Sequence, residues 1–213
     1  MFVNLHKLLH AAASTAMAGA LIAAAMPTAK AAGLFDNLGS SQDGSDPVFG
    51  VGPLAQSFST GAAGEGLIGV QLLLTSLSAA YTGSIQVSLL ADNFTSPGAT
   101  LAVLGSLANA AVSTTSYEVY DFLPASTIDL AANTRYWVEI AESTPNAIQW
   151  SYSYDQTAVG VANASAYSSA FGVDPSSSYG AYQLAVDVPE PGTFALLTGG
   201  LFCLGLIRRS RVA

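Results

Sequence analysis

Between residues 33 and 188, short apolar segments alternate with clusters of Gly, Ser, Asn, Asp and Pro, and no long segment repeats its apolar residues every 3.6 positions. The pattern is clearest in residues 84–90, where Ile85, Val87 and Leu89 alternate with polar residues. Successive side chains of a strand point to opposite faces of a sheet, so this alternation is typical of a strand with one buried face. The region is therefore expected to be built from strands rather than helices.

About eight segments are expected to be strands: residues 54–60, 67–77, 84–90, 100–104, 117–122, 135–141, 148–154 and 179–188. Because short turns join them and no helix lies between them, the pattern predicts an all-β fold, a two-sheet antiparallel β-sandwich of jelly-roll type. Residues 33–187 are enough for one such domain. An N-terminal signal peptide helix and a C-terminal hydrophobic helix are expected to flank it.

The few charged residues are distributed unevenly. Residues 32–188 contain thirteen acidic residues and a single basic one, Arg135. A region without Lys cannot neutralise a row of phosphates, which argues against nucleic-acid binding. His6, His10 and Cys203 also lie outside the region, so it lacks the residues of a Ser-His-Asp or Cys-His nucleophile and of an ordinary zinc or iron–sulfur site. No cofactor is expected, and the domain is expected not to be an enzyme.

Residues 1–31 are expected to form a secretory signal peptide. Lys7 supplies the positive charge, residues 8–26 are apolar, and Ala29 and Ala31 provide the small side chains that signal peptidase requires. Cleavage is expected after Ala31, with the next position a nearly equal choice. An uncleaved membrane anchor is the alternative. Signal peptidase is thus an expected partner, and the chain is expected to be exported.

The C-terminal residues 188–213 combine three elements. The motif Val188-Pro189-Glu190-Pro191 comes first, an apolar run over 193–207 follows, and a positive cluster closes the chain with Arg208, Arg209 and Arg211. Fifteen helical residues cover only about 22 Å, which is short of the ~30 Å hydrocarbon core. The arginines would hold the C-terminus in the cytoplasm, leaving the bulk of the chain outside.

These three elements closely resemble the PEP-CTERM sorting signal of Gram-negative bacteria. The resemblance implies an exosortase-type membrane protease-transpeptidase as a partner, which would remove the tail near the Pro-Glu-Pro. It also implies transient residence in the inner membrane, then transfer to the cell surface or an extracellular matrix, with an exopolysaccharide as a further candidate partner. A plain single-span membrane protein is the alternative.

The middle region resembles the choice-of-anchor domains of bacterial surface proteins. The resemblance is carried by Phe35-Asp36-Asn37, Ala55-Gln56-Ser57-Phe58, the segment from Leu130 to Val138, and Trp150. It implies a sandwich fold and a surface location, and it implies no activity.

Two carboxylate chemistries remain open for the exported region. Asp43 and Asp46 on one turn, and Asp92-Asn93 on another, are weak calcium candidates, although solvated turns are the favoured interpretation. A glycosidase needs two facing carboxyl groups, for which the candidates are Glu118, Asp121, Glu139 and Glu142. Charges that keep strands soluble are the commoner use of such residues.

An aromatic row is the remaining candidate site. Trp150, Tyr152 and Tyr154 are spaced by two and would share one strand face, where exposed rings can stack on sugars in a carbohydrate-binding module. The favoured interpretation is that Trp137 and Trp150 fill the core. The exposure of the row decides between the two.

Overall fold

The computed structural model of the chain describes residues 32–48, 53–94, 96–142, 145–154, 167–169, 172–174 and 180–189. The expected signal peptide and the sorting signal from Glu190 onwards lie outside these residues. Within the part that is described, no helix is long and apolar enough to cross a membrane.

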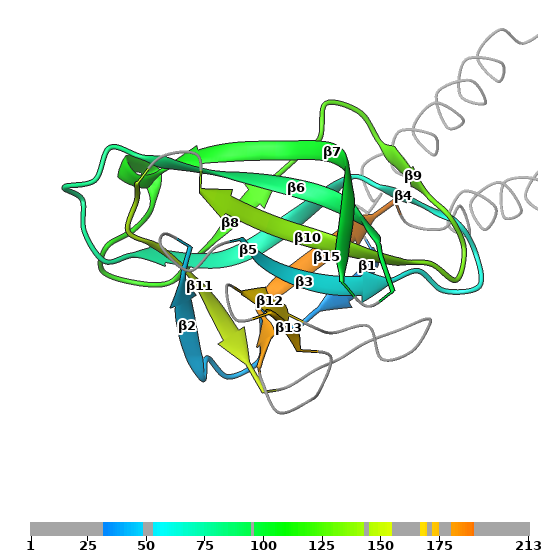
Figure 1. Ribbon diagram of the computed structural model, residues 1–213, viewed down its shortest axis with the longest axis horizontal. Helices are drawn as coiled ribbons and strands as arrows, with labels where there is room; N and C mark the ends of the chain where they lie inside the picture. Colours follow the sequence, from blue (N-terminus) through cyan, green and yellow to red (C-terminus); the bar gives the residue numbers. More distant parts are fainter. Residues whose placement is uncertain are drawn as a thin grey trace, which may run out of the picture. The chain divides into compact units, whose positions relative to one another are not determined.

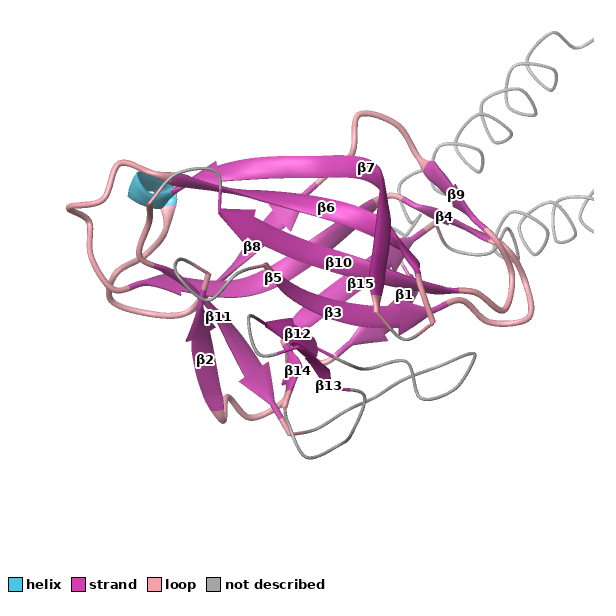
Figure 2. Cartoon of the chain, viewed as in Figure 1, coloured by secondary structure: helices cyan, strands magenta, loops and turns pink. Residues whose placement is uncertain are grey.

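The described residues form fifteen strands and one short 3-10 helix, η1 (Asn109–Ala111), as Figure 2 shows. In chain order the strands are β1 (Ala32–Asp36), β2 (Gly44–Pro47), β3 (Leu54–Ser59), β4 (Glu65–Leu67), β5 (Gly69–Ser76), β6 (Ser84–Asp92), β7 (Pro97–Ala108), β8 (Glu118–Phe122), β9 (Ile128–Leu130), β10 (Arg135–Glu142), β11 (Ile148–Ser153), β12 (Tyr167–Ser169), β13 (Gly172–Asp174), β14 (Ala181–Tyr182) and β15 (Leu184–Val188).

Two large antiparallel sheets make up most of the domain (Figure 1). In the first sheet, β5 pairs with β8, β11 and β15, while β1 pairs with β15, and β2 and β14 pair with β11. The second sheet has the order β13-β12-β3-β10-β6-β7, and β4 and β9 form a separate two-stranded sheet. The expected all-β fold with antiparallel sheets is therefore confirmed.

The alternation seen in the sequence produces the buried faces. On β6, Ile85, Val87 and Leu89 are buried and Gln86 is exposed, as the period of two predicts. On the neighbouring strand β10, Tyr136, Val138 and Ile140 face the same core. The main core thus receives one face of each large sheet.

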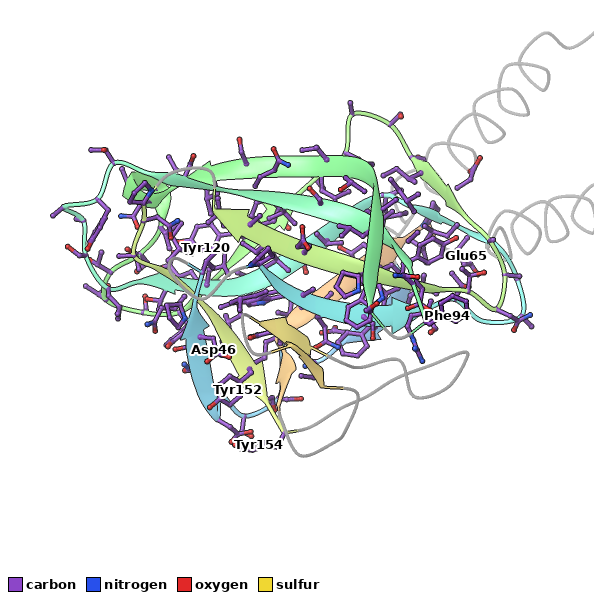
Figure 3. The ribbon with its side chains drawn as sticks, viewed as in Figure 1. Asp46, Glu65, Phe94, Tyr120, Tyr152 and Tyr154 are labelled. Atoms are coloured by element: carbon purple, nitrogen blue, oxygen red, sulfur yellow. The ribbon has the colours of Figure 1, made fainter. Side chains whose placement is uncertain are left out.

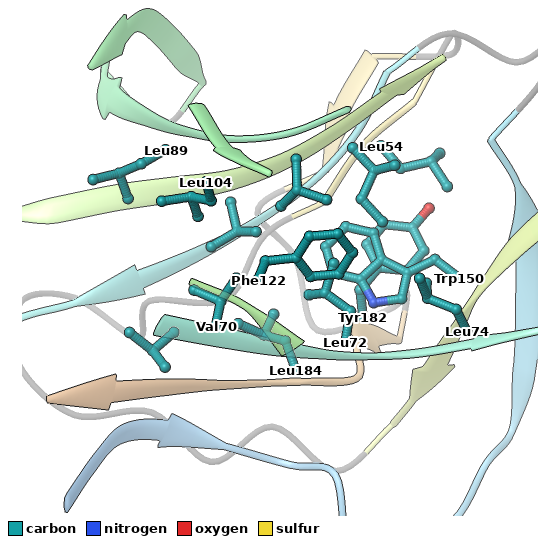
Figure 4. Packing of buried hydrophobic residues seen from close by; sticks show 14 of the residues in the cluster. Leu54, Val70, Leu72, Leu74, Leu89, Leu104, Phe122, Trp150, Tyr182 and Leu184 are labelled. Carbon is teal, nitrogen blue, oxygen red and sulfur yellow. The ribbon is translucent and has the colours of Figure 1, made fainter. Parts of the chain in front are cut away.

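Figure 4 shows the centre of that core. Leu72 and Leu74 of β5 and Leu184 of β15 come from the first sheet, and Leu54 and Leu89 come from the second. The rings of Trp150 and Tyr182 stack with centroids 4.5 Å apart. The other tryptophan, Trp137, is also buried, but it belongs to a separate small cluster with Ala55 and Leu90.

Several strand boundaries differ from those expected. The segment 67–77 is interrupted at Ile68: β4 pairs with β9 in the small sheet, whereas β5 pairs with β15 in the first sheet, and the N–H of Ile68 donates to the carbonyl of Asp187 (3.0 Å). The last segment is interrupted at Gln183, and β7 is longer than the expected 100–104. Strands β1, β2, β9, β12 and β13 were not predicted, because each has five residues or fewer and little alternation.

Candidate functional site

The sorting motif begins inside the folded domain. Strand β15 lies between β1 and β5, so that Val188 pairs with Ala32 and Val186 pairs with Val70. Val188 is only 3% exposed, whereas Pro189 is exposed. Proline has no N–H to donate to the ladder, which is a local reason for β15 to end at Val188.

The side chain of Asn37, directly after β1, holds the C-terminal strands in place. Its Oδ1 accepts a hydrogen bond from the N–H of Leu184 (2.8 Å), and its Nδ2 donates to the carbonyl of Tyr182 (3.3 Å). Asn37 is buried, so both main-chain groups would lose their partner without it. These bonds join residues about 145 positions apart in the sequence.

Gln183 and Gln56 extend this buried polar network. Gln183 Nε2 donates to the carbonyls of Asn37 (3.2 Å) and Ser40 (3.0 Å), and its Oε1 accepts from Ser151 Oγ (2.6 Å). Gln56 Oε1, from the opposite sheet, accepts from the N–H of Tyr182 (2.9 Å). Both the main chain and the side chain of Gln183, the residue between β14 and β15, therefore have hydrogen-bond partners.

Three of the residues that carry the resemblance to choice-of-anchor domains, Asn37, Gln56 and Trp150, bond to the main chain at the interruption between β14 and β15. Phe35 is in the core, Asn37 and Gln56 bond to the β14–β15 main chain, and Trp150 Nε1 donates to the carbonyl of Gln183 (3.0 Å). The sequence shows these short motifs, but it does not show that they bond to the same stretch of main chain, residues 182–184. Gln183 itself gave no sequence signal.

The other residues of the two processing signals lie outside the described part of the chain. These are Ala29 and Ala31 of the signal peptidase site, Glu190 and Pro191 of the sorting motif, and Arg208, Arg209 and Arg211 of the tail.

The candidate aromatic row is not exposed as a whole, and both tryptophans are buried, as the favoured interpretation predicted. Trp150 is completely buried in the main core, where its ring stacks on that of Tyr182. Tyr152 is half-buried and Tyr154 is 60% exposed, and their rings meet edge to face with centroids 6.0 Å apart. Trp150 is thus unavailable to a sugar, and the candidate surface shrinks to the two tyrosines.

Tyr152 occupies a specific setting, which Figure 3 shows beside Asp46 and Tyr154. Its ring packs directly on Gly44 and Gly180, where no Cβ would fit. Desolvation by burial raises the pKa of Tyr152, and the nearby Tyr154 and Asp46 raise it further. At neutral pH Tyr152 is therefore an uncharged phenol, and its ring lies on Gly44 of β2 and on Gly180, which directly precedes β14. We call Tyr152, Tyr154, Asp43 and Asp46 the tyrosine surface.

Asp43 and Asp46 were expected on a turn, but residues 44–47 form strand β2, so Asp46 lies on a strand and Asp43 directly precedes it. Both carboxylates already accept hydrogen bonds from the protein. Asp46 accepts from the hydroxyl of Tyr182 (2.8 Å), and Asp43 accepts from the N–H of Tyr154 (2.8 Å). On the other candidate turn, Asp92 accepts from Trp137 Nε1 (2.8 Å). Among the described residues, no group of three or more His, Cys, Asp or Glu side chains is arranged to hold a metal ion.

The four candidate glycosidase acids are divided between the sheets. Glu118 and Asp121 are on β8 of the first sheet, and Glu139 and Glu142 are on β10 of the second. Asp121 accepts from Gln71 (2.7 Å), beside core residues of β5 that point the other way. Glu139 pairs with Ala55 and Ser88 on the outer face of β10, and burial raises its pKa. Asp121 and Glu139 thus point away from each other and from the core.

Comparison with known proteins bears on the C-terminal end of the chain. No curated protein matches the chain. Residues 187–211 match the PEP-CTERM protein-sorting motif, which confirms the sorting signal predicted over residues 188–213. The motif implies that the chain is exported, that its C-terminus is transiently associated with a membrane, and that an exosortase-type enzyme processes it.

Proposed function

We propose that this chain is a non-enzymatic surface or exopolysaccharide-matrix protein, whose β domain is displayed after an exosortase-type enzyme removes the tail. The match of residues 187–211 to the sorting motif carries this proposal. The fold supports it, because the ordered strand β15 ends at Val188 and the Pro-Glu-Pro segment follows at once. The domain can therefore stay intact when the tail is cut.

The β domain is proposed to be of the choice-of-anchor type, with jelly-roll strand connections. The support is the meeting of Phe35, Asn37, Gln56 and Trp150 around the strands that lead into the sorting signal. These residues hydrogen-bond to or pack on the last strands of the domain. This arrangement suits a domain that precedes an anchor, because any force on the tail acts first on its last strand.

The absence of an enzymatic role is also a proposal. It is supported by the positions of Asp121 and Glu139 on opposite outer faces, since a glycosidase needs two carboxyl groups that flank one sugar. Incubation with the host polysaccharide should release no new reducing ends. Release that is lost in Glu139→Gln would contradict this part of the proposal.

Intact-mass spectrometry tests the sorting step. The protein is recovered from cells that possess or lack the exosortase-type enzyme. With the enzyme, the mass should correspond to a chain that begins near Ala32 and ends near the Pro-Glu-Pro; without it, the tail should remain. A variant with Pro189→Ala and Pro191→Ala should keep its tail in both strains. A tail that remains on the unaltered chain in the presence of the enzyme would refute the proposal.

Carbohydrate binding at the tyrosine surface is a second candidate function. The observation in its favour is that Tyr152 packs on Gly44 and Gly180 with the carboxylates of Asp43 and Asp46 nearby as hydroxyl acceptors. Tyr152→Ala should weaken binding of polysaccharide fragments about 10-fold. The control is Tyr81→Ala. It also removes an exposed tyrosine, but one that lies in the loop between β5 and β6 and is not part of the tyrosine surface. Equal losses in both variants would exclude a site at Tyr152.

A further inference from the structure

We infer that one end of the β domain lies against the lipid surface of the membrane for as long as the tail is attached. This end, called the signal end below, consists of the loops 60–64, 93–94, 123–127 and 131–134 with the start of β1 and the end of β15. The inference rests on the proposed function, because it requires the apolar tail to insert into the membrane.

Strand register places the two processing sites together in the first sheet. Ala32, the first residue after the expected signal peptidase cut, pairs with Val188 of the sorting motif. In the same sheet, Gly69 pairs with Asp187 and Val70 pairs with Phe122. The start of β1, the start of β5, the end of β8 and the end of β15 therefore lie at one end.

The second sheet contributes its loops to the same end. Ser59 at the end of β3 pairs with Arg135 at the start of β10, and Tyr136 pairs with Ala91 near the end of β6. Residues 60–68 lead from the end of β3 to the start of β5, and residues 123–134 lead from β8 to β10. Figure 3 shows Phe94 and Glu65 at this end of the domain.

The length of chain beyond Pro189 fixes how far this end can stand from the membrane. Only four residue steps separate Pro189 from Thr193, the first residue of the apolar run, so the reach is at most about 14 Å. As a helix, the apolar run of fifteen residues would be about 8 Å shorter than the hydrocarbon core, and closing that shortfall would draw the linker inwards. The linker length left between Pro189 and the hydrocarbon core is then comparable to the thickness of one headgroup layer, about 5–8 Å.

The signal end exposes two large apolar side chains at this distance. Phe94 is 95% exposed and Leu123 is 69% exposed. Phe94 also has a φ of 52°, which a bulky residue rarely adopts and which an Asn or Gly would adopt at lower cost. None of the four loops contains a charged residue, so approach to the headgroups costs little desolvation.

Lipid fits this surface better than a pocket in a partner protein. Phe94 follows β6 and Leu123 follows β8, so the two apolar side chains stand on loops of different sheets. Two apolar side chains on separate loops suit contact with a broad lipid surface better than contact with a single pocket. Glu65, Asp92 and Arg135 adjoin the loops, and Asp129 lies two residues before the loop 131–134. Because these charges are net negative, contact with the membrane must come from burying apolar groups rather than from attraction to anionic lipids.

Site-specific quenching tests the inference. The chain with Cys203→Ser is expressed in a Gram-negative host without an exosortase-type enzyme and recovered with its tail. It is reconstituted into phosphatidylethanolamine–phosphatidylglycerol vesicles that contain spin-labelled lipids. A fluorophore is attached at Phe94→Cys, Leu123→Cys or Leu77→Cys. Leu77 is the matched control, because it is also 69% exposed but follows the other end of β5.

The expected result is strong quenching at positions 94 and 123, insensitive to salt, and none at position 77. Ten Gly and Ser residues inserted between Gly192 and Thr193 should reduce the quenching, because the longer linker no longer holds the domain down. Equal quenching at all three positions overturns the inference. Quenching at 94 and 123 only when the exosortase-type enzyme is added also overturns it, and assigns the contact to that enzyme. If the chain does not float with the vesicles, tail insertion fails, and the proposed function fails with the inference.

Discussion

Replacing Asn37 by Ala should destabilise the domain far more than the size of the change suggests. The substitution leaves the buried N–H of Leu184 without an acceptor and removes a donor from the carbonyl of Tyr182. Leaving the buried N–H of Leu184 unsatisfied costs about 1–3 kcal/mol and losing the bond to the carbonyl of Tyr182 about 1 kcal/mol, so the free energy of unfolding should fall by about 2–4 kcal/mol. For a domain of this size, about 1 kcal/mol corresponds to about 2–4 °C, so Tm should fall by about 4–16 °C.

The assay is urea and thermal denaturation of the protein recovered from cells after processing, with Gln86→Ala as the control. Gln86 is an exposed amide on β6 whose Nε2 donates to Ser88 Oγ (3.3 Å), and its loss should change stability by no more than about 0.5 kcal/mol. If Asn37→Ala costs no more than Gln86→Ala, the network does not fasten β14 and β15, and the role assigned to it is wrong.

Three further predictions concern single sites. Burial raises the pKa of Glu139, so the folded protein binds that proton more tightly than the unfolded chain, and stability should fall as the pH rises through and above the usual range near 4. Glu139→Gln should flatten this fall in urea denaturation between about pH 4 and about pH 7; an unchanged slope would contradict it. Phe94→Gly should relieve the backbone at φ 52° by about 1 kcal/mol and raise Tm by about 2–4 °C, and a lower Tm would count against strain at this position. Calcium should raise Tm no more than sodium chloride of equal ionic strength, because Asp43 and Asp46 accept hydrogen bonds from the protein; a saturable extra rise that Asp46→Asn abolishes would reveal a built site.

The strands that the sequence predicted are those whose alternation is local. Strand β6 could be predicted because its apolar residues alternate with others and face the core: Ile85, Val87 and Leu89 are all buried. This pattern is complete within the segment itself. Strand β1 is short and does not alternate, and β2 consists of Gly44-Ser45-Asp46-Pro47; both pair with strands far away in the sequence, β1 with β15 and β2 with β11. Their formation is a tertiary effect that a local pattern does not contain.

The candidate sites show the same division. The spacing of Trp150, Tyr152 and Tyr154 correctly places all three on β11 or just beyond it, but it does not say which of the three rings the core encloses. Burial changes from complete at Trp150 to slight at Tyr154 over four residues, and this change decides which ring a ligand can reach. The bonds from Asn37 and Gln56 to the β14–β15 main chain were equally invisible, because their partners lie more than a hundred positions away.

The sorting motif itself joins folding to processing. Asp187 and Val188, the first residues of the matched segment, are part of β15, so an enzyme that acts on the folded chain meets the motif from Pro189 onwards. Pro189 ends the ladder because it lacks an N–H, and each proline of the motif favours an extended conformation in the residue before it. Pro189 thus stops the sheet at the point where the Pro-Glu-Pro segment begins. A cut within Pro-Glu-Pro would leave every hydrogen bond of β15 in place, whereas a cut before Val188 would require Val188 to leave its pairing with Ala32 and its place in the core.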